Sequence, residues 1–222
     1  MKIFFKNYKR TDRTLLSIQS VRFLFPNIKI CCLNLYDTSA DEYDLDIPNF
    51  NKWNVDLYFD KKKWNFGPGT YSSYNGYYFT EGINKIQALT KNDEKVLIID
   101  EDTFFTTGET IKFLLNNDFD LACSHWGSPE PVIYARRPKF ELNGSIICIN
   151  SKKLNELFPI IEQAEYIEIL LGHELYEKCI DLEFKVIEIA TRHGQNFFGD
   201  GCWANDIEKI KEELTKANIP YE

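Results

Sequence analysis

Four consecutive branched apolar residues, Val96 to Ile99, run directly into three acids, Asp100-Glu101-Asp102. A short unbroken apolar run is typical of a strand buried on both faces, as strands are in the middle of a parallel sheet. In open α/β sheets, ligands bind beyond the carboxyl ends of such strands. The run therefore predicts a central strand whose end places Asp100 and Asp102 on the same side of the chain.

Strand and helix patterns alternate around this segment. Apolar runs predict strands at residues 2–5, 28–35, 55–59, 119–124, 142–150 and 184–189. Helical spacing predicts helices at residues 11–25, 77–90, 110–115, 152–158, 160–179 and 205–216. The alternation is typical of the α/β class, with an open, mixed but mostly parallel sheet flanked by helices.

Composition sets the limits of what the chain binds. The 222 residues include 44% apolar residues, which is enough for a globular core, and residues 1–222 are expected to form one domain. The formal net charge is −8, and the densest basic run is Lys61 to Lys63. An acidic protein has no field that attracts nucleic acid or anionic lipid, so neither is an expected partner. A phosphate-bearing ligand has to be held by local groups.

The apolar runs and the cysteines indicate a cellular setting. No apolar run approaches the roughly 18 residues of a membrane span, so we expect no integral membrane segment and a soluble, cytoplasmic protein. The six cysteines show no C-x-x-C spacing, and several lie in apolar runs. They are expected to be buried, reduced thiols and not disulfides or zinc ligands.

The acidic triplet has two interpretations. Carboxylates of Asp100 and Asp102 on one side of a strand end repel each other unless a cation lies between them, and hard oxygen ligands suit Mn²⁺ or Mg²⁺. Such an ion can bridge a diphosphate and neutralise charge that develops on it as a leaving group. The alternative is a solvated strand end that leads into a turn.

The segment Val96 to Phe105 resembles the strand and Asp-x-Asp motif of nucleotide-sugar-dependent glycosyltransferases of the GT-A fold. Further segments, over residues 2 to about 195, are similar to the inverting GT-A family in the same order. The resemblance implies a Rossmann-like GT-A domain. Residues 1–125 would form the half that binds the nucleotide sugar, and residues 126–222 the half that binds the acceptor.

The resemblance also implies donor-binding residues. Tyr8 takes the place of an aromatic ring that stacks on the nucleotide base, and Asp37 that of an acid that accepts a hydrogen bond from the base. Asp100 would contact metal-bound water or ribose, and Lys85 would offset the charge of the diphosphate. The alternatives are an ordinary Asx turn at Asp37 and a solvated helix lysine at Lys85.

The later segments imply the remaining site residues. Glu174 stands where the family has its general base, and His193 where a histidine completes the metal shell with Asp100 and Asp102. The alternatives are a helix N-terminal acid and a histidine satisfied in a loop or core. Trp126 either stacks on a sugar face or fills the core. Two further acids in the C-terminal segment are reserve candidates for the base or the metal ligand, Asp200 and Asp206.

The resemblance therefore implies a metal-dependent, inverting transfer of a sugar from a nucleotide-diphosphate donor, with UDP the expected nucleotide, to a hydroxyl acceptor on a glycan or small molecule. A retaining GT-A transferase is the near alternative. A nucleotide-sugar-binding protein without turnover and a nucleotidyltransferase are the others. The nucleotidyltransferase is disfavoured because the stretch from Asn7 to Thr11 contains no glycine for a phosphate-binding loop.

Overall fold

The computed structural model describes residues 1–7, 11–34, 47–59, 82–91, 93–101, 103–126, 142–163, 178–191, 201–203 and 206–222. Their strands are β1 (Lys2–Asn7), β2 (Lys29–Asn34), β3 (Val55–Phe59), β4 (Lys95–Asp100), β5 (Thr103–Phe105), β6 (Leu121–Trp126), β7 (Leu142–Asn150), β8 (Val186–Thr191) and β9 (Gly201–Trp203). Their helices are α1 (Thr11–Leu24), α2 (Ile47–Lys52), α4 (Glu109–Asn116), α5 (Ser151–Gln163), α7 (Ile207–Lys216) and two segments at 82–89 and 178–181. None of the helices described here is long and apolar enough to cross a lipid bilayer.

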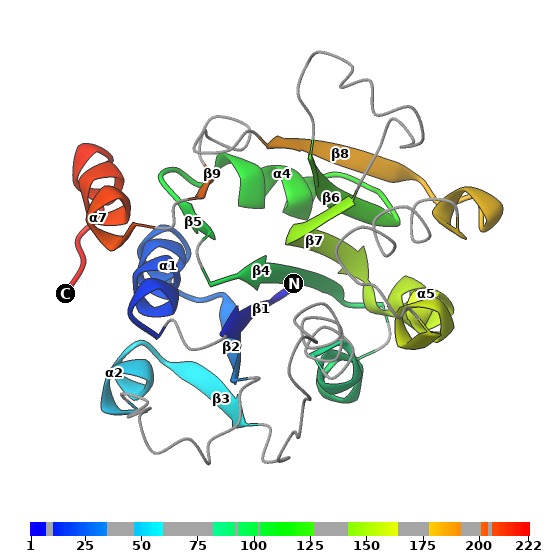
Figure 1. Cartoon of the computed structure of the whole chain (residues 1–222), viewed down its shortest axis with the longest axis horizontal. Helices are drawn as coiled ribbons and strands as arrows, with labels where there is room; N and C mark the ends of the chain where they lie inside the picture. The colour runs from blue at the N-terminus through cyan, green and yellow to red at the C-terminus, as the bar shows by residue number, and fades with distance from the viewer. Residues whose placement is uncertain are drawn as a thin grey trace, which may run out of the picture.

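Seven of the strands form one mixed sheet in the order β3-β2-β1-β4-β7-β6-β8 (Figure 1). The pairs β3-β2, β2-β1, β1-β4 and β6-β8 are parallel, and β7 runs antiparallel to both of its neighbours. Since β4 and β6 both oppose β7, six strands point the same way and end at the same edge. The predicted α/β class and its mixed, mostly parallel sheet are therefore confirmed.

Helices cover both faces of this sheet. Successive residues of β1 and β4 point to opposite faces, and the apolar residues at the centres of both strands, 3–5 and 96–99, are completely buried. On one face, they pack on α1 and α4 through a cluster that includes Phe5, Ile18, Val21, Ile99, Ile111 and Leu114. On the other face, they pack on the helix at 82–89 and on α5 through a cluster that includes Phe4, Ile83, Ile86, Ile98, Leu154 and Leu157.

The C-terminal segment returns to the strand that follows the acids. Strand β9 pairs antiparallel with β5, with Trp203 opposite Thr103. Helix α7 packs on α1 and on β5 through a third apolar cluster, formed by Leu16, Phe104, Ile210, Leu214 and Ile219. The backbone N–H of Glu222 donates to Gln19 Oε1 at 2.9 Å, and Lys52 forms an ion pair with the Glu222 carboxylate. The C-terminal segment therefore contacts α1, α2 and the strand that follows the acidic triplet.

The sequence placed most strands within two residues of their positions, but it missed three short elements. Strand β1 continues through Lys6 and Asn7, beyond the predicted end at residue 5. Strands β5 and β9 and helix α2 were not predicted. Strands of three residues carry no periodicity of their own, and this pair depends on contact between segments almost a hundred residues apart.

The predicted break between two helices at Pro159 was wrong, because α5 runs through it to Gln163. A proline inside a helix removes one backbone hydrogen bond and costs about 3 kcal/mol. Burial of Leu154 and Leu157 against the sheet opposes this cost on the preceding turns. The remainder of the second predicted helix, up to residue 177, lies outside the described residues.

A buried polar network joins the ends of β1 and β2. Asn7 Nδ2 donates to Asn34 Oδ1 at 2.7 Å, and Thr14 Oγ1 donates to Asn7 Oδ1 at 3.0 Å. Asn34 Nδ2 donates in turn to the carbonyl of Tyr58 at 3.3 Å. All three side chains are buried, so each bond also satisfies a polar group that water cannot reach. The network ties three neighbouring strands and the first turn of α1 together at one edge.

The cysteines behave as the sequence predicted where their side chains are described. Cys31, Cys32, Cys123, Cys148 and Cys179 are all free and buried. Burial raises the pKa of Cys31 to about 11 and that of Cys148 and Cys179 to about 12. These thiols stay protonated at neutral pH, and a protonated thiol is a poor nucleophile.

We expect the native protein to resist thiol reagents. At pH 8, a chromogenic disulfide reagent should label the five buried cysteines only on the timescale of unfolding, because burial blocks access and suppresses the thiolate. Only Cys202, whose side chain lies outside the described set, is a candidate for rapid labelling. The same protein in guanidinium chloride should release the signal of all six cysteines at once. Rapid native labelling of several thiols would contradict this burial.

Asn34→Ala tests the buried network. The substitution removes the acceptor of Asn7 Nδ2 and leaves that donor buried, so the free energy of unfolding should fall by about 2 kcal/mol. Urea titration followed by circular dichroism measures this change. Asn51→Ala on the exposed surface of α2 is the matched control and should stay within about 0.5 kcal/mol of the wild type. Equal effects of the two substitutions would show that the network contributes nothing specific.

Candidate functional site

The polar residues of the sheet gather at its carboxyl edge. Strands β1, β2 and β4 end in Asn7, Asn34 and Asp100, and these strands are parallel neighbours. Because parallel strands of similar register end side by side, their last residues share one edge. The side chains of Asn7 and Asn34 are buried and hydrogen-bonded to each other, whereas the side chain of Asp100 is one third exposed.

Asp100 is paired with a lysine from the neighbouring strand. Lys6 and Asp100 are register partners in the β1-β4 pair, and Lys6 Nζ lies 2.6 Å from Asp100 Oδ1. The alternation of both strands puts these side chains on the face of Phe4 and Ile98, above the apolar cluster of that face. The lysine side chain is only 16% exposed. This ion pair is therefore partly sheltered from water and fixes the position of the carboxylate.

Lys85 supplies a second positive charge on the same face. It lies on the exposed side of the helix at 82–89, and its Nζ is 5.5 Å from the centre of the Tyr58 ring. Tyr58 is the last but one residue of β3, so this cation–π contact places Lys85 toward the carboxyl edge. Desolvation raises the pKa of the Tyr58 hydroxyl, which therefore stays neutral at physiological pH.

The turn that carries the acids is bound to α1. Ser17 Oγ donates to the carbonyl of Glu101 at 3.3 Å, and Ser20 Oγ accepts from the backbone N–H of Phe105 at 3.3 Å. Ser17 and Ser20 lie one turn apart on α1 and face the β4-β5 connection together. Two hydrogen bonds from one rigid helix thus flank residue 102 on both sides.

Trp126 ends β6 at the same edge as Asp100, two strands away across β7. Its side chain lies outside what is described, so its contact with a sugar stays a prediction. Asp206 has a local role, since its Oδ1 accepts from the backbone N–H of Glu208 at 2.9 Å and caps α7. The other predicted site residues lie outside the described residues, namely Tyr8, Asp37, Asp102, Glu174, His193 and Asp200.

Of the three predicted metal ligands, only Asp100 is among the described residues. Within the ranges that the structure covers, no three His, Cys, Asp or Glu side chains lie together as a group that could hold a metal ion. Asp100 contributes a partly exposed carboxylate, which is the hard oxygen ligand that Mg²⁺ and Mn²⁺ take. The donor chemistry therefore fits these ions. The further ligands that the sequence nominates, Asp102 and His193, are among the residues not described.

Sequence reasoning missed Lys6 and the two buried asparagines. Lys6 follows Phe5 and lies outside the strand predicted at residues 2–5, although it continues the alternation of Lys2 and Phe4. That alternation was a usable signal for its face. Its pairing with Asp100 leaves no such signal in the sequence. Asp100 lies 94 positions further along the chain, and the pairing depends on β1 and β4 being neighbours in the sheet.

Comparison with solved structures identifies the fold. The galactosyltransferase LgtC, in an active-site mutant form, superposes with a TM-score of 0.56 at 15% identity, covering 97% of this chain and 96% of that one. LgtC in complex with donor and acceptor sugar analogues gives a TM-score of 0.51 at 17% identity, covering 85% and 73%. The inositol-1-phosphate CTP transferase of T. maritima gives 0.54 at 9% identity, covering 100% and 97%.

Comparisons by sequence add nothing to this result, since no family model and no curated protein matches the chain. The structural similarity spans nearly the whole chain, but at these identities it speaks for the fold alone. The fold expected from the resemblance is confirmed: the chain has a GT-A-like fold.

Proposed function

We propose that the protein is a glycosyltransferase that moves a sugar from a nucleotide-diphosphate donor, expected to be a UDP-sugar, to a hydroxyl acceptor. The observation that carries this proposal is the end of β4, where Asp100 lies at the carboxyl edge of the sheet with Lys6 beside it. Lys85 adds a second cation on the same face. In a protein of net charge −8, Lys6 and Lys85 are local cations that a diphosphate can contact.

The proposed donor site lies in residues 1–125. Asp100 and Asp102, with His193, would hold Mn²⁺ or Mg²⁺, which when bound neutralises charge on the diphosphate leaving group. Tyr8 would stack on the base and Asp37 would accept a hydrogen bond from it. Both follow β1 and β2, whose ends are fixed by the asparagine network, so that network supports the positions from which these two segments leave the sheet.

The proposed acceptor site lies in residues 126–222. Glu174 would take the proton from the acceptor hydroxyl as that oxygen attacks the sugar, with inversion at the anomeric carbon. Trp126, at the end of β6, would offer a flat apolar face to a sugar ring. A retaining mechanism is the alternative, and the anomeric configuration of the product, read by NMR, separates the two.

A nucleotidyltransferase is the second candidate, because the T. maritima CTP transferase shares the fold over the whole chain. The absence of glycine from Asn7 to Thr11 argues against it, since phosphate-binding loops need glycine for close backbone approach. Two assays separate the candidates. A glycosyltransferase releases nucleoside diphosphate from a nucleotide sugar, and a nucleotidyltransferase releases pyrophosphate from a nucleoside triphosphate and a sugar phosphate.

Ligand binding should raise the thermal stability of the protein. UDP at about a hundred times its dissociation constant, with Mn²⁺, should raise the melting temperature by roughly 5 to 10 °C, because a ligand that binds only the native state stabilises it. A thermal-shift panel of UDP, GDP, CDP and ADP, each with EDTA, Mg²⁺ or Mn²⁺, measures the effect. No shift with any combination would contradict the proposed donor site.

Asp102→Asn should lower metal-dependent turnover by at least about a hundredfold, because metal stabilisation of the leaving diphosphate is worth several kcal/mol. The measurement is nucleoside diphosphate release at saturating Mn²⁺, with circular dichroism to confirm the fold. Asp118→Asn is the matched control, since Asp118 is an exposed acid that precedes β6, far along that strand from its carboxyl end. Undiminished turnover in Asp102→Asn would remove this residue from the mechanism.

A further inference from the structure

Strand β1 carries two lysines on the same face, one near each end. Lys2 Nζ lies 3.6 Å from Glu94 Oε2, just before β4 begins, and Lys6 Nζ lies 2.6 Å from Asp100 Oδ1, where β4 ends. Both lysines are largely buried, with 10% and 16% of their side chains exposed. The two ion pairs therefore have the same construction at opposite edges of one strand pair.

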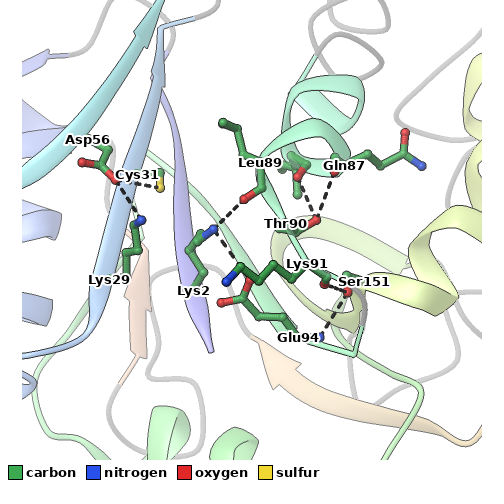
Figure 2. A network of polar contacts seen from close by, with 11 residues as sticks. Lys2, Lys29, Cys31, Asp56, Gln87, Leu89, Thr90, Lys91, Glu94 and Ser151 are labelled. Atoms are coloured by element: carbon green, nitrogen blue, oxygen red, sulfur yellow. Dashed lines mark hydrogen bonds and ion pairs between the residues drawn. The ribbon is translucent and has the colours of Figure 1, made fainter.

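The pair at the amino edge belongs to the scaffold. Figure 2 shows Lys2 between Glu94 and the carbonyl of Leu89, to which its ammonium donates at 2.6 Å. Nearby, Ser151 Oγ bridges the carbonyl of Lys91 and the backbone N–H of Glu94. These contacts join the end of the helix at 82–89 to the start of α5. Lys2 thus links the end of the helix at 82–89 to the start of β4, at the edge opposite the one where parallel sheets bind ligands.

The pair at the carboxyl edge has a different setting. Asp100 is the first acid of the triplet, and a third of its side chain faces solvent. The ammonium of Lys6 pairs with Oδ1 of Asp100. Without this pair, the negative charge of Asp100 would stand uncompensated beside the acids at positions 101 and 102 of the sequence. A fixed positive charge at this position repels a divalent cation and attracts a diphosphate, and its partial burial limits screening by salt.

We propose that Lys6 is a positioning residue that serves as the resident countercation of the acidic edge, weakening metal binding at Asp100 and strengthening metal-free binding of a nucleoside diphosphate. This inference rests on the proposed function, because it concerns the same donor site. It adds that the edge is partly charge-compensated before any metal arrives, by a residue from the neighbouring strand.

Lys6→Met tests the inference because it removes the charge and keeps most of the buried side-chain volume. Two equilibrium measurements are needed: Mn²⁺ binding without nucleotide, from the EPR signal of free Mn²⁺, and UDP binding in EDTA, by calorimetry. The Mn²⁺ affinity should rise by about three- to tenfold, and the UDP affinity should fall by about tenfold, since the lost charge acts on the two ligands with opposite signs. General damage to the site would lower both affinities.

Lys2→Met is the matched control. It removes the equivalent charge from the other end of the same strand, so it should lower the unfolding midpoint and leave both affinities within about twofold of the wild type. Lys6→Arg keeps the charge and should keep both affinities close to the wild type. If Lys6→Met does not fold, Lys6→Gln, which also lacks the charge, replaces it in the same two measurements.

The inference is overturned if both affinities fall together in the uncharged variant, or if neither changes. A wild-type protein that binds UDP with Mn²⁺, but shows no dependence on Lys6 in either measurement, overturns the inference alone. A wild-type protein that binds no nucleoside diphosphate with or without metal overturns the proposed function itself.

Discussion

The buried hydrogen bond between Asn7 and Asn34 is the interaction on which the arrangement of the carboxyl edge depends. It joins the last residues of two neighbouring parallel strands, and Thr14 extends it to the first turn of α1. A buried amide pair of this kind tolerates little displacement, because any shift leaves a polar group without a partner and without water. The edge is therefore rigid where two chain segments leave it. The proposed donor site is built from those two segments, and it requires this rigid support.

The same strand also shows how one structural device can serve two purposes. Lys2 and Lys6 both extend from the face of Phe4 and both meet an acid that flanks or ends β4. At the amino edge, Lys2 and Glu94 also form hydrogen bonds with residues at the ends of two helices, so this ion pair stabilises the fold. At the carboxyl edge the partner acid Asp100 is one third exposed, so in the proposed role the charge of the lysine acts on a ligand that approaches this acid. Position along the strand, and not residue type, separates the two roles.

The sequence predicted the parts of the fold that depend on local pattern. The unbroken run from Val96 to Ile99 predicted a central strand, which the structure confirms. Asp100 ends that strand at the carboxyl edge of the sheet. It failed where a residue matters through a distant partner. The pairing of β5 with β9 and the ion pair of Lys6 both join segments about a hundred residues apart, and neither leaves a periodic signal. The helix break predicted at Pro159 was wrong for the opposite reason, because tertiary packing overrode a strong local signal.

The net charge of −8 makes the placement of positive charge the decisive question for any phosphate ligand of this protein. Two cations toward the carboxyl edge are held by dissimilar partners, Lys6 by the Asp100 carboxylate and Lys85 by the face of Tyr58. The contact with an aromatic ring leaves the charge of Lys85 intact, whereas the opposite charges of Lys6 and Asp100 nearly cancel each other at long range. At short range both members of the pair still act on a ligand. In the proposed role of Lys6, the choice between a bare diphosphate and a divalent cation therefore depends on contact geometry, because the Lys6–Asp100 pair has little net charge at a distance.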